Sequence, residues 1–284
     1  MENYNQIPVA VIISVYGRDD PMYFSESLTS ISHQITRCDV RIYLYIDGAV
    51  NSSILAVVDK FRPLIFKILS SPENKGLSHA LNSLIGSLSD EVFVFRMDAD
   101  DISRLHRIET TVDFMLKSEV DVAGGWIEEF GDCVKGRRVV KFPVHHNSIW
   151  ASLPFRSPLA HPTVCFTRRV FQAGLRYPDV RFNEDVALWF RLMREGYVFG
   201  NVPSVLLDYR MGAEFFSRRS LKKAFKEVSV YFRGLSELKF PVYYYVFPII
   251  RLCVRMLPLS LIHLVYEVRA RLWGFGGSLF RKRV

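Results

Sequence analysis

The chain has 284 residues, of which 49% are hydrophobic, 14% aromatic and 23% charged, with four cysteines and a net charge of +8. This composition excludes a disordered, collagen-like or disulfide-scaffold chain, because each of those has far fewer apolar residues or far more Gly, Pro or Cys. The cysteines show no CxxC or CxxH spacing, which argues against a zinc site and suits a reducing cytosol.

Strands and helices are expected to alternate over the first 120 residues. Unbroken apolar runs, beginning with VAVIISV, predict buried strands, and apolar residues at three- and four-residue spacing predict helices. The expected order is strand 9–15, helix 22–35, strand 41–46, helix 52–61, strand 64–69, helix 77–88, strand 91–97 and helix 105–116. This order is typical of βαβ units and predicts an α/β fold with a doubly wound, mostly parallel, Rossmann-like sheet.

Polar residues follow each of these strands, at the end of the sheet where ligands bind in such folds. The segments are SVYGRDD after the first strand, Asp47-Gly48 after the second, ENKG after the third and Asp98-Ala-Asp-Asp after the fourth. No GxGxxG or GxxxxGK[ST] motif occurs, which excludes a dinucleotide fingerprint and a P-loop. Carboxylates that hold a divalent cation could instead neutralise a phosphate ligand.

The MDADD segment places three carboxylates within four residues, directly after a buried strand. Asp98 and Asp100 can share a face in extended geometry, and Mg²⁺ or Mn²⁺ would relieve their mutual repulsion. The competing interpretation is an Asx-turn and helix cap. We expect Asp101 or Ser103 to cap the helix at 105–116 in either case.

The carboxyl-terminal part of the chain differs sharply from the rest in charge. Residues 216–284 carry 14 Lys/Arg against 3 Glu, whereas residues 1–215 carry 23 Lys/Arg against 26 Asp/Glu. Basic residues there alternate with apolar runs of at most 11 residues, and a spanning helix needs about 20. The pattern favours helices lying on an anionic membrane surface. A helical cap packed on the main domain and a re-entrant or spanning hairpin remain alternatives, whereas nucleic-acid binding is disfavoured because the basic residues stand among Leu, Ile and Tyr runs.

Seven segments between residues 8 and 211 together resemble one enzyme family. They are IISVYGRDDPMYFSESLTSISHQ, YIDG, ENKGLSHALN, FRMDADDISRLHRIE, HPTVCFTRRVF, NEDVALWFRLMREG and LLDYRM. In this order they resemble the family 2 inverting glycosyltransferases of the GT-A fold, of the bacterial O-antigen and exopolysaccharide type. The resemblance implies a GT-A domain over 1–215, with a nucleotide-sugar half at 1–119 and an acceptor half at 120–212, followed by a basic helical tail at 216–284 for membrane association.

The resemblance also implies roles for individual residues. Asp185 matches the catalytic base, and Asp98 and Asp100 match the ligands of Mn²⁺ or Mg²⁺. The residues expected to bind the nucleotide-sugar are Tyr16, Gly17, Arg18, Asp47, Lys75, Asp98 and Arg107. The residues expected on the acceptor side are His161, Glu184 and Trp189.

The chemistry of inversion agrees with these roles. A single displacement at C1 needs a base for the acceptor hydroxyl and charge stabilisation for the departing diphosphate. Asp185 at a helix start would stay ionised near the positive end of the helix dipole, although a purely structural carboxylate would do the same, and Asp179 competes for the role. Many relatives have a histidine after the Tyr-Arg pair, but here Met211 follows Arg210. Either Asp100, the diphosphate and water hold the metal, or Arg210, Arg218 and Arg219 supply positive charge.

The expected function is transfer of a sugar from a nucleotide-sugar, most simply a UDP-sugar, to a lipid-diphosphate-linked saccharide in O-antigen or capsule synthesis. The enzyme would lie peripherally on the cytoplasmic face of the inner membrane, with a polyprenyl-diphosphate saccharide as acceptor and no nucleic-acid partner. A nucleotidyltransferase of similar fold and a dTDP-rhamnose-using transferase remain alternatives. A non-enzymatic scaffold would leave the MDADD and NED segments without a role, and a processive synthase would need a QxxRW motif that is missing.

Overall fold

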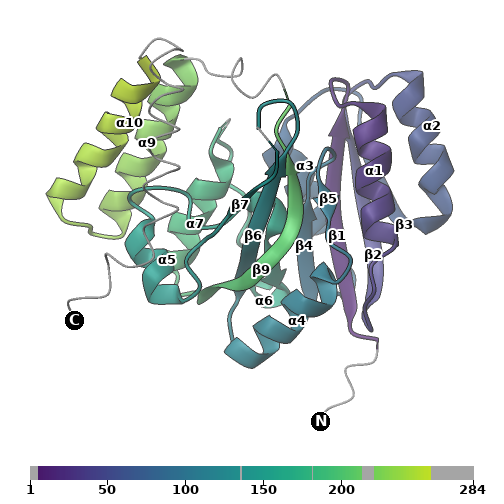
Figure 1. Ribbon diagram of the computed structural model, residues 1–284, viewed down its shortest axis with the longest axis horizontal. Coiled ribbons are helices and arrows are strands. Elements are labelled where there is room, and N and C mark those ends of the chain that lie inside the picture. The colour runs from purple at the N-terminus through teal and green to yellow at the C-terminus, as the bar shows by residue number, and fades with distance from the viewer. Residues whose placement is uncertain (1–5, 135, 181, 213–220, 257–284) are drawn as a thin grey trace.

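A computed structural model describes residues 6–134, 136–180, 182–212 and 221–256 (Figure 1). The described strands are β1 (Pro8–Tyr16), β2 (Asp39–Asp47), β3 (Ile65–Ser71), β4 (Phe93–Met97), β5 (Ile102–Ser103), β6 (Val122–Phe130), β7 (Arg138–Val140), β8 (Cys165–Thr167) and β9 (Phe199–Arg210). The described helices are α1 (Pro21–Ser32), α2 (Ser52–Phe61), α3 (Leu77–Gly86), α4 (Arg107–Ser118), α5 (His146–Ser152), α6 (Arg168–Gln172), α7 (Glu184–Arg194), α9 (Leu221–Glu237) and α10 (Val246–Met256), with short 3₁₀ turns η1 (Arg62–Leu64), η2 (His161–Thr163) and η3 (Val242–Tyr245).

The strands of the described part of the chain form one mixed sheet in the order β3-β2-β1-β4-β8-β6-β9-β5, with β7 beside β6. The first four strands are parallel, as the alternation of strands and helices predicts. Beyond β4 the sheet contains antiparallel pairs, because β8 runs opposite to both β4 and β6. The prediction of a mostly parallel sheet is therefore right for the amino-terminal half; in the other half β6 and β9 are parallel, and the short antiparallel pairs make the sheet as a whole mixed.

Helices cover both faces of the sheet, because side chains of a buried strand point alternately to its two sides. On β1, Ala10 and Ile12 belong to one core, and Val9, Val11 and Ile13 belong to the other. The first core is built with α3, α5, α6, α7 and α9, and the second with α1, α2 and α4. The chain is thus doubly wound, as predicted.

One expected detail at the end of β4 is wrong. Neither Asp101 nor Ser103 caps the following helix, which begins at Arg107 after His106 without a side-chain cap. Ser103 instead lies in β5, where it pairs with Leu207 of β9. Asp101 accepts a hydrogen bond of 2.8 Å from the backbone N–H of Arg210. Pairing with a distant strand therefore replaces the local cap.

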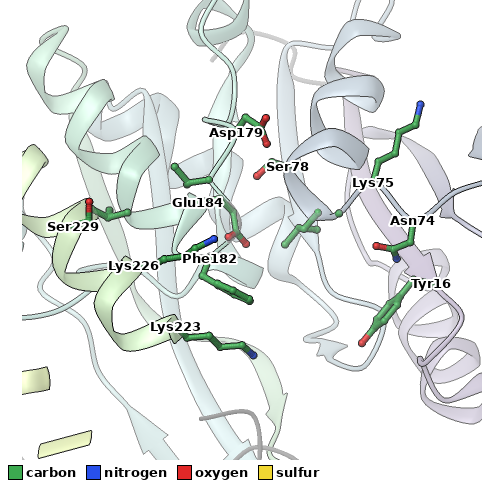
Figure 2. Close-up of a pocket in the computed structure, with 14 residues that line it drawn as sticks. Tyr16, Asn74, Lys75, Ser78, Asp179, Phe182, Glu184, Lys223, Lys226 and Ser229 are labelled. Atoms are coloured by element: carbon green, nitrogen blue, oxygen red, sulfur yellow. The ribbon is translucent and has the colours of Figure 1, made fainter. Parts of the chain in front are cut away.

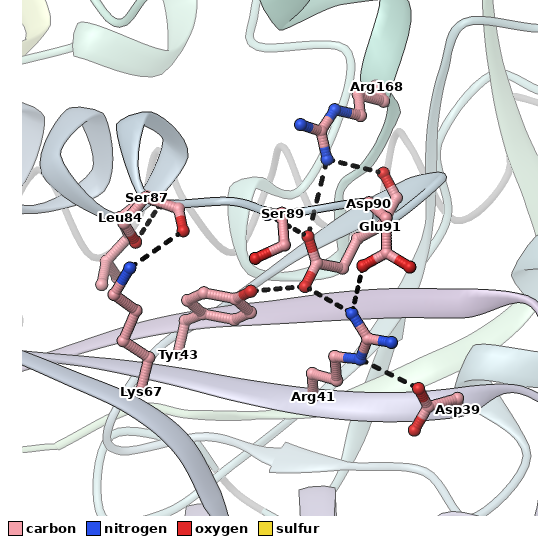
Figure 3. A network of polar contacts seen from close by, with 10 residues as sticks. All are labelled: Asp39, Arg41, Tyr43, Lys67, Leu84, Ser87, Ser89, Asp90, Glu91 and Arg168. Atoms are coloured by element: carbon pink, nitrogen blue, oxygen red, sulfur yellow. Dashed lines mark hydrogen bonds and ion pairs between the residues drawn. The ribbon is translucent and has the colours of Figure 1, made fainter.

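A polar network secures the opposite, amino-terminal ends of the strands (Figure 3). Its centre is Glu91, which is fully buried just before β4. The Glu91 carboxylate accepts hydrogen bonds from the Tyr43 hydroxyl and, at 2.8 Å, from the Ser89 backbone N–H. Arg41 and Arg168 lie 3.3 and 3.6 Å from it. A buried carboxylate is stable only when it is paired in this way, so the network fixes β2, β4 and α6 to one another.

Helices α9 and α10 fall within the segment predicted as the tail, and α9 packs on α7 (Figure 1). Tyr231 and Leu235 of α9 are buried, and the Tyr231 ring lies edge-on to Phe190 of α7 at 5.7 Å between centroids. Arg251 of α10 forms an ion pair of 2.7 Å with Glu227 of α9. The described part of the tail is thus a helical pair fixed to the main domain, and residues 257–284 lie outside the described residues.

Among the helices that the structure describes, none combines the length and the apolar character needed to cross a membrane.

Candidate active site

The turn after β1 lies directly against the turn after β2. The backbone N–H of Tyr16 donates a hydrogen bond of 2.9 Å to Asp19, which shapes the first turn. A Cβ atom on Gly17 would lie 2.7 Å from the carbonyl oxygen of Ala49, so only glycine allows this approach. Arg18 is exposed on the same turn. Three of the residues expected to bind the nucleotide therefore stand at the carboxyl end of β1.

Asp47 holds the loop that leads into α3. Its two carboxylate oxygens accept hydrogen bonds from the backbone N–H groups of Lys75 at 2.8 Å and Gly76 at 2.9 Å. Gly76 has a φ of +90°, a conformation that favours glycine. Each Asp47 oxygen keeps a lone pair that could accept a hydrogen bond from a further donor. The Lys75 side chain is exposed and extends outward from the loop (Figure 2).

Three carboxylates gather after β4. Oxygen atoms of Asp98, Asp100 and Asp101 all lie within 4.8 Å of one another. Asp98 forms a bidentate ion pair with the buried Arg96. Burial, together with the charges of Asp98 and Asp100, raises the pKa of Asp101 well above its usual range.

Arg210, at the end of β9, fixes the backbone around these carboxylates. Its Nε donates a hydrogen bond of 2.8 Å to the carbonyl oxygen of Asp100, and its guanidinium lies 2.5 Å from Glu26. The same guanidinium stacks over the Tyr23 ring at 3.9 Å from the centroid. Arg210 thus supplies positive charge beside the acidic turn, while the neighbouring Met211 is buried and Arg218 and Arg219 lie outside the described residues.

The carboxylate cluster suits a divalent cation. One oxygen of the buried Asp101, Oδ2, has no hydrogen-bond partner among the described residues. Three carboxylate oxygens within 4.8 Å of one another are ligands of the kind that Mg²⁺ and Mn²⁺ prefer, and a cation would offset the repulsion that, together with burial, raises the pKa of Asp101. Asp98 and Asp100, the residues expected to hold the metal, therefore belong to a group that fits one.

Arg107 lies behind the acidic turn and not beside it. It is buried, and its guanidinium donates hydrogen bonds to the carbonyl oxygen of Arg96 at 2.7 Å and to the sulfur of Met97 at 3.1 Å. Burial lowers the pKa of Arg107 to about 10. The structure gives Arg107 a place supporting β4 from within the core, so contact with a nucleotide would need it to move.

A pocket of about 880 Å³ opens between the strand ends, the loop before α7 and helix α9 (Figure 2). Tyr16 and the loop 74–78 form one wall. Asp179, Phe182 and Glu184 form the floor between the walls, and α9 forms the other wall through Lys223, Lys226, Ser229 and Val230. The pocket thus joins the expected nucleotide side to residues of the expected acceptor side.

Glu184 and Asp185 begin α7, in an environment that disfavours charge. Burial and the neighbouring Asp185 raise the pKa of Glu184 to about 7. Burial likewise raises the pKa of Asp185, while the backbone N–H of Val186 and the positive charge of Arg96 act against that rise. A carboxylate with a raised pKa is a stronger base than an exposed one, which suits proton abstraction.

The charge of Arg96 acts on both acidic groups. Arg96 pairs directly with Asp98, and its charge acts on both Glu184 and Asp185. Sequence reasoning passed over this residue, although a signal existed. Arg96 is the one charged side chain within the strand FVFRM, and residues two apart on a strand share a face, so its position predicts a pairing with Asp98.

The other two residues expected on the acceptor side lie deeper. His161 contacts the Tyr177 hydroxyl at 2.9 Å, and burial lowers its pKa well below the usual range. Trp189 is 0% exposed and packs edge-on to His161 and parallel to Phe166, each at 6.0 Å between centroids. Trp189 is therefore a core residue that supports His161, and it offers no free face for a sugar in this structure.

Comparison with known proteins identifies relatives of the chain. The family model described as Glycosyl transferase family 2 matches residues 10–174. The chain is 30% identical to an Escherichia coli UDP-Gal:alpha-D-GlcNAc-diphosphoundecaprenol beta-1,3-galactosyltransferase, over 91% of this chain and 94% of that protein. It is 29% identical to the Erwinia amylovora amylovoran biosynthesis glycosyltransferase AmsE, over 91% of this chain and 97% of that protein.

The fold has relatives among solved structures. The mannosyltransferase PcManGT from Pyrobaculum calidifontis, solved with GDP-Man and Mn²⁺, superposes with a TM-score of 0.60 at 15% sequence identity. The match covers 93% of this chain and 80% of the mannosyltransferase. At this identity the likeness concerns the fold, and it extends over the sheet and its covering helices.

Proposed function

We propose that this chain, which belongs to glycosyl transferase family 2 and is an inverting glycosyltransferase, moves a hexose from a UDP-sugar to a saccharide on a lipid diphosphate. The similarity to the Escherichia coli galactosyltransferase, over nearly the whole of both chains, supports this donor and acceptor class. The similarity to the amylovoran enzyme supports a place in the synthesis of a bacterial surface polysaccharide.

In the proposed reaction Asp185 is the base. Its carboxylate takes the proton from an acceptor hydroxyl, and the freed oxygen attacks C1 of the donor sugar from the face opposite the diphosphate. The bond between C1 and the diphosphate oxygen breaks, UDP leaves, and the configuration at C1 inverts. The raised pKa of Asp185 supports this role, because it brings the basicity of the carboxylate closer to that of a neutral-pH catalyst.

Asp98 and Asp100, with the buried Asp101 behind them, would hold Mn²⁺ or Mg²⁺. When bound, the cation supplies positive charge that stabilises the departing diphosphate. Tyr16, Gly17, Arg18 and Asp47 would orient the nucleotide at the ends of β1 and β2, where open α/β sheets bind their ligands. Arg210 holds the backbone of the acidic turn in place for this task.

The observation that carries the proposal is the position of Arg96. One guanidinium pairs with Asp98 and acts on the pKa of Asp185, so the proposed metal carboxylates and the proposed base are under the influence of the same charge. A displacement in which a diphosphate leaves on one side of a sugar and a base acts on the other needs these two groups to flank a single space.

Two variants test the proposal by separating binding from chemistry. We expect Asp100→Ala to abolish transfer and to weaken the metal-dependent affinity for UDP, measured by calorimetry with and without Mn²⁺. We expect Asp185→Asn to abolish transfer and to leave UDP affinity close to that of the unmodified protein, because Asp185 lies on the acceptor side. Turnover of Asp185→Asn near the normal rate would contradict the assignment of the base.

A donor screen with a short lipid-diphosphate saccharide tests the substrate class, with linkage and anomeric form read by NMR. Release of UDP with an inverted product supports the proposal. Release of pyrophosphate would identify a nucleotidyltransferase instead, and transfer from dTDP-rhamnose alone would replace the donor.

We further infer peripheral binding to the cytoplasmic face of the inner membrane. Apolar side chains on η3 and α10 are exposed: Val242 (84%), Tyr243 (65%), Val246 (46%), Ile249 (46%) and Ile250 (50%). Such a surface beside basic residues is typical of helices in the headgroup layer. Co-sedimentation with anionic liposomes at low salt tests this, and protein that stays in the supernatant would contradict it.

A further inference from the structure

Helix α9 contributes two lysines to the wall of the pocket, Lys223 and Lys226. Their ammonium nitrogens lie 4.7 and 5.7 Å from the centroid of the Phe182 ring, which forms part of the pocket floor. Cation–π contacts of this kind hold both side chains toward the interior (Figure 2). This wall lies outside residues 10–174, the part of the chain that matches the family model.

Lys226 is half-buried. Its side chain is directed into the pocket, away from the carboxylates of α9. The ion pairs described on α9 join Glu227 to Arg251, and Glu237 to Arg194 and Arg233. None of these pairs involves Lys226. A half-buried ammonium group in a pocket is strongly stabilised by an anionic ligand, because the surrounding protein screens the attraction less than water does.

The lysines stand on the acceptor side of the proposed chemistry. Glu184 lines the same pocket and precedes Asp185, the proposed base. Tyr16 and Asn74 form the opposite wall at the strand ends, where the nucleotide is expected. Where the acceptor is a single sugar on a lipid diphosphate, as in the name of the Escherichia coli relative, the diphosphate on C1 lies across one ring from the reacting hydroxyl and so within one sugar of the base.

The same pair of helices carries the exposed apolar surface. Helix α10 packs antiparallel along α9 (Figure 1), and Arg251 of α10 pairs with Glu227, the residue after Lys226. The exposed Ile249 and Ile250 therefore lie on α10 at the level of the lysines. A ligand with an anionic headgroup and a long apolar chain could contact both features at once.

We propose that Lys223 and Lys226 bind the diphosphate of the lipid-linked acceptor, a polyprenyl diphosphate, so that the chain selects a charged acceptor over a neutral one. This inference rests on the proposed function, because it assigns a subsite to that acceptor. Lysine binds phosphate oxygens as a mobile point charge, which suits a headgroup that must enter and leave in each cycle.

The test compares two acceptors that differ only in the anion. One is the acceptor saccharide on a lipid diphosphate, and the other is the same saccharide as a neutral alkyl glycoside. The ratio measured is kcat/KM for the diphosphate acceptor divided by kcat/KM for the neutral acceptor. We expect the double variant Lys223→Ala/Lys226→Ala to lower this ratio by about tenfold or more, because it loses charge-assisted hydrogen bonds to the diphosphate. Lys223→Arg/Lys226→Arg should restore most of the ratio, and Lys117→Ala, an exposed lysine on α4, should not change it.

A binding measurement keeps the inference separate from the proposed function. The measurement uses farnesyl diphosphate without donor, and farnesol as the uncharged comparison. Farnesyl diphosphate should bind the unmodified protein about tenfold or more tightly than it binds the double variant. An unchanged ratio and unchanged binding would overturn the inference while leaving the proposed transferase intact. Equal losses with both acceptors, together with weaker UDP binding, would assign the lysines to the donor instead. Binding of farnesyl diphosphate without transfer to either acceptor would overturn the proposed function and keep the lysine site.

Discussion

Gly234 allows α9 to lie close to α7, and its replacement by alanine tests how tightly this wall of the pocket is held. A Cβ atom at this position would lie 2.2, 2.3 and 2.5 Å from three ring atoms of Phe190. Carbon atoms in contact are normally about 3.5–4.0 Å apart, so α9 or the ring must move. Phe190 is buried against Tyr231 and has little room to do so.

Two opposing effects decide the sign of the change in stability. Alanine favours a helix interior over glycine by about 1 kcal/mol. Overpacking a buried contact costs about 1–3 kcal/mol, and the upper part of that range applies because the ring is hit at three atoms. We therefore expect Gly234→Ala to lower the free energy of unfolding by about 1–2 kcal/mol, which shifts Tm down by about 2–4 °C for each kcal/mol.

Urea unfolding followed by circular dichroism measures this change, and Gly86→Ala is the matched control. Gly86 ends α3, and a Cβ atom there would meet nothing within 4 Å, so this variant should be neutral or slightly stabilising. Adding Phe190→Leu to Gly234→Ala should recover part of the loss, since the smaller side chain removes the clash. A stabilising effect of Gly234→Ala alone would refute the close packing of α9 on α7.

Three further predictions concern charged groups. Glu91→Ala should destabilise the fold by about 3–5 kcal/mol, because it leaves buried partners unsatisfied. UDP affinity, measured by calorimetry, should stay unchanged, because the Glu91 network lies at the amino-terminal ends of the strands, away from the candidate site. Arg96→Met should move the acidic limb of the kcat/KM pH profile to higher pH, since the lost charge no longer lowers the pKa of Asp185. Arg96→Lys should move the limb back. Identical pH profiles of Arg96→Met and the unmodified protein would contradict the effect of Arg96 on Asp185. Glu184 binds a proton more tightly in the folded than in the unfolded state, so the free energy of unfolding should fall as pH rises from 4.5 to about 7. Glu184→Gln should flatten that part of the stability curve, and an unchanged slope would count against the raised pKa.

The amino-terminal half of the fold is predictable because its signals are local. A buried parallel strand is apolar on both faces, and the helix that follows shows its own periodicity, so β1 to α4 can be read from short windows of sequence. The turn after β4 is not local in this sense. Ser103 forms β5 only because Leu207, about a hundred residues later, is available to pair with it, and Asp101 is used by Arg210.

The candidate site divides in the same way. The MDADD carboxylates are adjacent in sequence and their clustering is visible there, whereas the lysines of α9 face the pocket only because α9 packs on α7. Trp189 shows where an argument from sequence spacing fails. It lies one helical turn after Asp185, but its side chain is buried in the core and does not face the expected acceptor side. The roles assigned to the individual site residues, Asp185 included, stay predictions.

The packing of α9 on α7 also determines the order in which the pocket can be completed during synthesis. The nucleotide side is built from residues that leave the ribosome early, and the α9 wall comes from residues 221–237. A nascent chain stopped near residue 215 could form the strand ends and the acidic turn, yet Phe190 would face water and the pocket would stand open on one flank. Late arrival of this wall would keep the immature chain from completing the pocket before α9 and α10 are made.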